Sequence, residues 1–254
     1  MKEADNWTDN LSIILVRPEF LGNIGSTCRV MKNFGFTDLR LVEAPKNYKD
    51  SEARMMAVGA FDILKQAKLF DSLEDAVEDI GLTIATSSGR KRSRPLKNLF
   101  AMTDEIIAFA KENKVAIVFG HERNGLRDDE MALLNRKVRI ETSLEFPSMN
   151  VAQAVCAVVY ALAARANLNP EQPSEVRKAP QLPSATERRD LFEQFDLLID
   201  NIEFSRSFNR DKVLAEIRDA FERMTPTRRE SALIKGVLFN LNRKLSDSKS
   251  GSDE

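Results

Sequence analysis

Three short segments of the chain combine glycine with side chains that can bind or orient a small ligand. They are residues 22–29, 119–126 and 146–154. Each segment follows an apolar run that is typical of a buried strand. Glycine lets backbone amides approach a ligand closely, while asparagine, serine, arginine and glutamate side chains supply hydrogen bonds and charge. The pattern predicts a ligand site assembled from three loops that are distant in the sequence.

In the first segment, Asn23 and Gly25 predict a tight turn into the amino end of a helix. Arg29 follows Gly25 by one helical turn, so these two residues share a face of that helix. From the spacing alone, a solvated arginine explains the pattern as well as a substrate ligand does. An arginine keeps its proton at neutral pH. We therefore expect Arg29 to hold a phosphate or a developing alkoxide rather than to act as a base.

In the second segment, Gly120 ends a buried strand, and Asn124 and Gly125 allow a backbone turn. Glu122 is the carboxylate of the tight part of this loop, and it can either cap the loop or belong to a ligand pocket. His121 is the chain's sole histidine, and no second histidine or cysteine pair lies at ligand spacing. We therefore expect no metal site.

The third segment places Ser148 and Asn150 at the start of a strongly apolar helix. Either residue is a good amino-terminal cap, because its side-chain oxygen can accept a bond from a free helix amide. Capping and lining a pocket are compatible roles. This segment therefore completes the predicted site without excluding a purely structural explanation.

The composition predicts a globular protein with one α/β domain and a smaller appendage. The chain has 254 residues, 43% of them apolar, and a formal net charge of −1. With so little net charge, binding of a nucleic acid requires local clusters of lysine and arginine. The densest basic run is residues 88–97, which contains Arg90, Arg92 and Arg94. Such a run is often only a solvated loop, but this one follows a predicted strand, as the three segments do, and we favour phosphate binding.

The two cysteines and the amino-terminal residues bear on the cellular compartment. Cys28 and Cys156 lie in predicted helices rather than in a disulfide framework, which is typical of a reducing environment. We interpret both as small buried residues; a catalytic thiol is the alternative, and Arg29 beside Cys28 leaves it open. Residues 1–10 lack the apolar core of a signal peptide, and no stretch approaches the ~20 apolar residues that span a bilayer. We expect a soluble, cytoplasmic protein.

Hydrophobic periodicity predicts strands and helices in alternation. We expect strands at 12–17, 39–42, 82–87, 115–120 and 137–142, and helices at 24–34, 51–66, 73–79, 102–111, after Asp128 and at 150–167. This order favours a mostly parallel sheet covered by helices on both faces. Ligands of such sheets bind at the carboxyl ends of the strands, where the three segments lie.

A change in composition after residue 168 predicts the domain boundaries. We expect an α/β domain at 1–168, a proline-rich linker at 169–184, a helical RNA-binding module at 185–245 and a disordered tail at 246–254. The module should hold helices at 187–204, 212–224 and 227–244, the last opened by a capping box of Thr227 and Glu230. Its arginines and lysines form a second candidate RNA patch.

The three segments, in this order and spacing, resemble the motifs of the SpoU branch of the SPOUT methyltransferases. That resemblance implies an α/β fold with a carboxyl-terminal trefoil knot, methylation of RNA and the cofactor S-adenosylmethionine. It assigns the active site to Asn23, Arg29, Glu122, Ser148 and Asn150. It assigns the cofactor site to Ser87, Gly120, Glu122, Ile140, Met149 and Asn150, and RNA contacts to Arg17, Arg29, Arg90, Arg92 and Arg94. Many members have serine where this chain has Ala152, so that hydroxyl contact is missing here.

Within the branch, the chain is most similar to members that methylate the ribose of nucleotide 32 in tRNA. The similarity lies in the Arg17-Pro18 pair, the run at residues 28–36 and the short linker to a helical module. It implies a tRNA partner, a product of S-adenosylhomocysteine and a homodimer formed through the knot region. Two alternatives remain: a SpoU enzyme for ribosomal RNA or another tRNA position, and a catalytically silent RNA-binding protein on the same fold.

Overall fold

The computed structural model describes residues 7–88, 96–143, 145–168, 180–202, 204 and 209–250. The chain divides into two compact units, Met1–Ala179 and Pro180–Glu254, and each unit is described by itself. Within the described ranges, no helix combines the length and the apolar character needed to cross a membrane.

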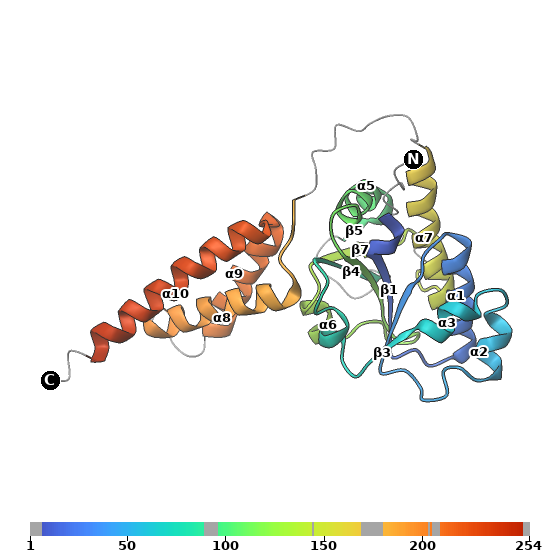
Figure 1. The fold of residues 1–254 in the computed structure, drawn as a ribbon, viewed down its shortest axis with the longest axis horizontal. Coiled ribbons are helices and arrows are strands. Elements are labelled where there is room, and N and C mark those ends of the chain that lie inside the picture. Colours follow the sequence, from blue (N-terminus) through green and yellow to red (C-terminus); the bar gives the residue numbers. More distant parts are fainter. Residues whose placement is uncertain are drawn as a thin grey trace. The chain divides into compact units, whose positions relative to one another are not determined.

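A seven-stranded sheet forms the centre of the first unit (Figure 1). Its strands are β1 (Leu11–Val16), β2 (Asp38–Val42), β3 (Lys68–Phe70), β4 (Leu82–Ser87), β5 (Lys97–Asn98), β6 (Val115–Phe119) and β7 (Arg136–Arg139). They lie in the order β3-β2-β1-β6-β4-β7-β5, and every neighbouring pair is parallel. Each residue of β1 and β6 is buried, as their continuous apolar sequences require when helices cover both faces of a sheet.

The helices of this unit pack on the sheet and on one another. They are the short 3-10 helix η1 (Trp7–Asn10) and the α-helices α1 (Leu21–Asn33), α2 (Ser51–Met56), α3 (Phe61–Gln66), α4 (Leu73–Ala76), α5 (Leu99–Ala110), α6 (Asp128–Ala132) and α7 (Val151–Leu168). The helix α1 packs against α2, α3 and α7, and α7 packs against α5. Figure 1 shows α1, α2 and α7 on one side of the sheet and α6 on the other. The predicted α/β architecture is confirmed.

The strand order places a crevice where the three motif segments meet. From β1 the chain passes to β2 on one side, whereas β6 leads to β7 on the other, so the connections diverge between β1 and β6. Loops that leave two such strands in opposite directions open a crevice at the carboxyl end of the sheet. The segments that follow β1, β6 and β7 are the three predicted motifs.

The structure differs from the sequence predictions in three places. The predicted helix 51–66 is two helices, α2 and α3, separated by a turn that contains Gly59 with a positive φ. The strands β3 and β5 were not predicted, because three and two residues carry no readable alternation. The helix α1 begins at Leu21 rather than near Ile24, so the predicted turn that contains Asn23 and Gly25 is part of the helix. A Cβ at Gly25 would stand 2.1 Å from the carbonyl oxygen of Ala53, so this glycine permits close packing of α1 on α2.

The second unit consists of three helices, α8 (Ala185–Asn201), α9 (Arg210–Met224) and α10 (Arg228–Ser250), with α8 packed against both of the others. The predicted capping box is present: Thr227 N donates to Glu230 Oε2 at 2.7 Å, and Glu230 N donates to Thr227 Oγ1 at 3.1 Å. The helix α10 continues to Ser250, so residues 246–250 are helical rather than part of a disordered tail, and residues 251–254 lie outside the described residues. In that extension, the Ser246 hydroxyl donates to the carbonyl of Asn242 one turn earlier.

Candidate functional site

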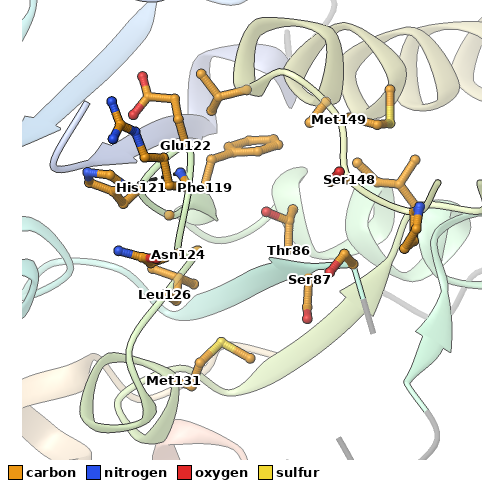
Figure 2. Close-up of a pocket in the computed structure, with 18 of the residues that line it drawn as sticks. Thr86, Ser87, Phe119, His121, Glu122, Asn124, Leu126, Met131, Ser148 and Met149 are labelled. Carbon is orange, nitrogen blue, oxygen red and sulfur yellow. Dashed lines mark hydrogen bonds between the residues drawn. The ribbon is translucent and has the colours of Figure 1, made fainter. Parts of the chain in front are cut away.

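A cavity of about 580 Å³ lies at the carboxyl ends of β4, β6 and β7 (Figure 2). Its lining comes from residues 86–88, 119–128, 140, 142, 147–149 and three further positions, Met131, Val151 and Ala154. Figure 2 shows Ser148 and Met149 on one side, His121, Glu122 and Asn124 on the other, and Thr86 and Ser87 between them. This volume and this mixture of apolar side chains, hydroxyls and free backbone groups suit a small organic ligand.

The loop after β6 forms one wall of the cavity and is closely folded on itself. A Cβ at Gly120 would lie 2.2 Å from Leu126 N and 2.3 Å from Gly125 C, so only glycine fits at this crossing of the chain. Gly125 has a φ of +68°, and its amide donates to the His121 carbonyl at 2.8 Å. These contacts fold residues 120–125 into a tight turn that lines the cavity.

Side chains from all three motif segments join in one hydrogen-bonded chain. Asn23 Nδ2 on α1 donates to Glu122 Oε1 at 3.2 Å, and Asn150 Nδ2 donates to Asn23 Oδ1 at 2.8 Å. Asn150 Oδ1 in turn accepts from the amide of Ala152 at 2.9 Å and so caps α7. Asn23 therefore links the loop after β6 to the start of α7.

Glu122 also caps the start of α1. Its carboxylate accepts from the amide of Glu19 at 3.0 Å and from the amide of Phe20 at 3.4 Å, directly before the first residue of that helix. A negative charge is favoured at the amino end of a helix. The capping role and the pocket role of Glu122, which the sequence left as alternatives, thus coexist.

A second group of side chains holds the same loop against the segment before α1. Arg123 Nη2 donates to Glu19 Oε1 at 2.9 Å, and Arg123 N donates to His121 Nδ1 at 3.1 Å. His121 Nε2 lies 3.6 Å from Glu19 Oε2. The sequence predictions missed Glu19 and Arg123, because no local pattern relates residues that are 104 positions apart. Among the described residues, no group of histidine, cysteine and carboxylate side chains could hold a metal ion.

The structure brings six of the nine residues predicted for the active site and the cofactor site to this cavity. Ser87, Gly120, Glu122, Ile140, Ser148 and Met149 line it. Asn23 and Asn150 do not line it but are joined to Glu122 by the bonds described above. Arg29 is exposed on α1 and is not among the lining residues. The cavity is also lined by residues that were not predicted, among them Thr86, Phe119 and Met131. Thr86 and Phe119 could have been inferred, because each lies at the end of a strand.

Arg17, a predicted RNA contact, is paired with a buried carboxylate. Its guanidinium forms a bidentate ion pair with Glu130, whose side chain is 4% exposed. Arg17 Nη2 donates to Glu130 Oε2 at 3.0 Å. Arg17 also has a φ of +50°, an unusual conformation for a residue before proline, where the chain turns out of β1. The guanidinium neutralises a buried carboxylate here, and the role of Arg17 as an RNA contact stays a prediction.

The remaining predicted RNA contacts belong to the basic run at residues 88–97 and to the second unit. Arg90, Arg92 and Arg94 lie outside the described residues. In the second unit, four basic side chains of the predicted patch or near it are held in ion pairs: Arg188 with Glu222, Arg210 with Asp196 and Asp200, Arg228 with Glu187, and Lys235 with Asp190. Each of these pairs reduces the positive field that the paired side chain could direct at a phosphate. The second patch stays a prediction.

Cys28 does not have the properties of a catalytic thiol. Its side chain is fully buried, and burial raises the pKa of the thiol to about 12. A group whose pKa is raised this far stays protonated through neutral pH and is a poor nucleophile. Cys156 is partly exposed.

We therefore expect iodoacetamide near pH 8 to alkylate Cys156 in the folded protein and to leave Cys28 unmodified. Mass spectrometry of digested samples would measure both positions, and the protein unfolded in guanidinium, where both thiols should react, is the control. Equal modification of the two cysteines in the folded protein would show that Cys28 is accessible and reopen the thiol alternative.

Comparison with known proteins identifies similar chains. The model of the SpoU rRNA Methylase family matches residues 10–160. The tRNA (cytidine-2′-O-)-methyltransferase TrmJ of Methanocaldococcus jannaschii is 37% identical over 195 residues, which cover 76% of this chain and 83% of that protein.

Solved structures show the same fold. The crystal structure of TrmJ from Z. mobilis ZM4 is 29% identical, covers 91% of this chain and 98% of that chain, and superposes with a TM-score of 0.74. The SpoU methyltransferase AviRb from Streptomyces viridochromogenes, solved in complex with the cofactor AdoMet, is 20% identical and has a TM-score of 0.50. It covers 62% of this chain and 60% of that chain.

Proposed function

The chain belongs to the SpoU rRNA methylase family, and on that premise we propose that it is a tRNA ribose 2′-O-methyltransferase that uses S-adenosylmethionine. The observation that carries the proposal is the convergence of the three motif segments. Asn23, Glu122 and Asn150, which are far apart in the sequence, form one hydrogen-bonded chain at the edge of a cavity with the volume of a small-molecule site.

The cavity suits an adenosine-like cofactor. Apolar side chains such as Phe119 and Ile140 can contact a flat base, and the hydroxyls of Ser87 and Ser148 can bond a ribose or an amino-acid group. The crowded backbone at Gly120 fixes the position of the turn that forms this side of the cavity. The complex of AviRb with AdoMet supports this choice of cofactor for the fold. When bound, S-adenosylmethionine would supply a methyl group on a sulfonium, which is a good leaving group.

The side chains around the cavity would then position the acceptor ribose. The amides of Asn23 and Asn150 can donate to ribose oxygens once RNA binds, and Glu122 fixes the orientation of Asn23 by accepting its bond. We assign Arg29 to the substrate phosphate and to the developing 2′-alkoxide, since a guanidinium stabilises negative charge but does not accept a proton. Transfer from a sulfonium needs alignment and exclusion of water more than acid catalysis, and this arrangement is sufficient for that.

We propose nucleotide 32 of the tRNA anticodon loop as the target. The name of the similar protein from Methanocaldococcus jannaschii, a tRNA (cytidine-2′-O-)-methyltransferase, supports tRNA as the substrate. The resemblance within the SpoU branch supports the position. Ribose-methylation mapping of tRNA and ribosomal RNA from a strain that lacks the gene would test both points. Loss of the mark at nucleotide 32 is expected. Loss of a mark elsewhere in tRNA or in ribosomal RNA would replace this target by the sister-enzyme alternative.

The second alternative, a catalytically silent RNA-binding protein, makes a different prediction. Isothermal titration with S-adenosylmethionine should release heat and saturate at one cofactor per chain if the cavity is the cofactor site. A silent module should give no heat of binding. This measurement needs no RNA, so it separates a loss of cofactor binding from an error in the proposed substrate.

We further propose that the chain is a homodimer formed through a carboxyl-terminal trefoil knot. The exposed position of Arg29, away from the lining of the cavity in its own subunit, supports a role for this arginine in the site of the partner subunit. Dissociation of the dimer should then abolish activity. A cytoplasmic location stays a prediction of the sequence.

Residues 88–97 are proposed to bind the tRNA backbone. Changing Arg90, Arg92 and Arg94 together to alanine should weaken tRNA binding and reduce the slope of log K against log salt by about 2 units. Fluorescence anisotropy at several salt concentrations would measure both effects. A variant that loses Lys46 and Lys111, two exposed lysines of the same unit, is the charge control. An unchanged slope in the arginine variant would assign this run to plain solvent exposure.

A further inference from the structure

The helix α10 of the second unit carries an apolar stripe that the three-helix module does not cover. Leu233, Val237 and Leu241 are 61%, 60% and 44% exposed, although they lie on the helix that packs most extensively on α8. Successive members are four residues apart, so the three side chains follow one another along the same side of the helix. The buried side of α10 is formed by other residues, among them Ser231, Leu238 and Asn242.

The buried apolar residues of the module lie elsewhere and include none of the stripe: they are Leu182, Leu191, Phe192, Ile199 and Leu238. Among the described residues of α9, none is buried, although this helix carries a clear apolar face. Single exposed apolar residues are common on protein surfaces, but three in a continuous row on one helix are typical of an interaction surface. The stripe therefore calls for a partner whose own surface is apolar and elongated.

The charges at the two ends of the stripe indicate which partner fits. Glu230 and Lys244 lie seven residues before and after Val237, and Leu233 and Leu241 lie four residues before and after it. A twofold axis through Val237 would place a second α10 antiparallel to the first. In that arrangement, Leu233 lies opposite Leu241 of the other copy, and Glu230 lies opposite Lys244 of the other copy. A parallel pair would instead set each charge against its like.

We propose that α10 forms an isologous, antiparallel contact with α10 of a second copy of this chain, centred on Val237. Three apolar side chains per copy bury much less area than the ~800 Å² per partner of a stable interface, so the contact is too small to form a dimer by itself. It forms when another contact already holds two copies together, because tethering raises the effective concentration of one module for the other. The inference thus rests on the homodimer proposed above.

Cysteine cross-linking in the full-length protein tests this contact. In Val237→Cys, the new thiol lies on the twofold axis, where two antiparallel helices bring equivalent residues close enough for a disulfide. Phe239→Cys is the matched control, since Phe239 is 55% exposed on the same helix but points away from the stripe. Both variants keep Cys28 and Cys156, so background oxidation is common to them. Thermal melting would show that each variant is folded.

Under mild oxidation, Val237→Cys should form a covalent dimer severalfold faster than Phe239→Cys, at a rate that does not depend on protein concentration. Adding Lys244→Glu to Val237→Cys should slow cross-linking, because a glutamate would then face Glu230 of the other copy. Adding Lys212→Glu, on α9, should not.

Equal rates for the two cysteine variants, or a rate proportional to concentration, would overturn the contact. Size-exclusion chromatography separates this failure from that of the homodimer. If the protein elutes as a dimer but Val237→Cys does not cross-link selectively, only the proposed α10 contact is wrong. If the protein elutes as a monomer and does not cross-link, both the α10 contact and the homodimer are wrong.

Discussion

Changing Arg29 to alanine should abolish methyl transfer while leaving the affinity for S-adenosylmethionine close to that of the unchanged protein. Arg29 is exposed on α1 and does not line the cavity, so its removal takes no contact from the cofactor site. It does remove the positive charge assigned to the substrate phosphate and the developing alkoxide. Loss of one such electrostatic contact typically lowers the catalytic rate by about 100- to 1,000-fold.

Single-turnover methylation of tRNA would measure the rate, and isothermal titration would measure cofactor affinity. Lys111→Ala removes an exposed charge from another part of the same unit and serves as the control. Substantial turnover by Arg29→Ala would show that the proposed role is wrong. A large loss of cofactor affinity would instead place Arg29 in the cofactor site.

Changing Gly120 to alanine should have the second large effect, a loss of cofactor binding. The added Cβ would lie 2.2 Å from Leu126 N, and it would meet backbone rather than a flexible side chain. The loop of residues 120–125 must therefore shift, and with it the wall of the cavity. Overpacking of this kind costs about 1–3 kcal/mol, so we expect affinity to fall by roughly 10- to 100-fold or more.

Isothermal titration of Gly120→Ala with S-adenosylmethionine would test this expectation. Gly236→Ala is the matched control, because that helical glycine has no atom within 4 Å of the added methyl group. Its alanine variant should bind cofactor unchanged. Normal affinity in Gly120→Ala would mean that the loop after β6 does not form the cofactor wall, and the proposed site would have to move.

The two variants together can show whether Arg29 acts within its own subunit or across the dimer. If Arg29 acts in the site of the partner subunit, a mixed dimer combines the intact cavity of the Arg29→Ala subunit with the intact arginine of the Gly120→Ala subunit. Activity should then reappear after subunits exchange. If Arg29 acts within its own subunit, each half of the mixed dimer lacks one part, and activity should stay absent. The mixing experiment therefore uses two impaired proteins to distinguish the two geometries.

The sequence by itself determined the main elements and which segments would meet at the cavity. The apolar runs that became β1, β4 and β6 and the periodic run that became α7 are long enough for local pattern to identify them. Alternation of these elements was enough to predict the parallel sheet. The motif segments were recognisable because glycine, asparagine and glutamate recur at strand ends, where a parallel sheet places its ligands.

Only the tertiary structure decided which of those residues touch. Asn150 and Asn23 are 127 positions apart. Arg17 and Glu130, which form an ion pair, are 113 positions apart. Periodicity reports which face of an element is apolar but not which distant side chain will lie opposite. The same limit applies to the exposed stripe on α10, since an apolar helix face becomes a surface or a core according to what packs on it. Long-range pairing is set by the order of strands and the packing of helices, and that information is distributed over the whole chain.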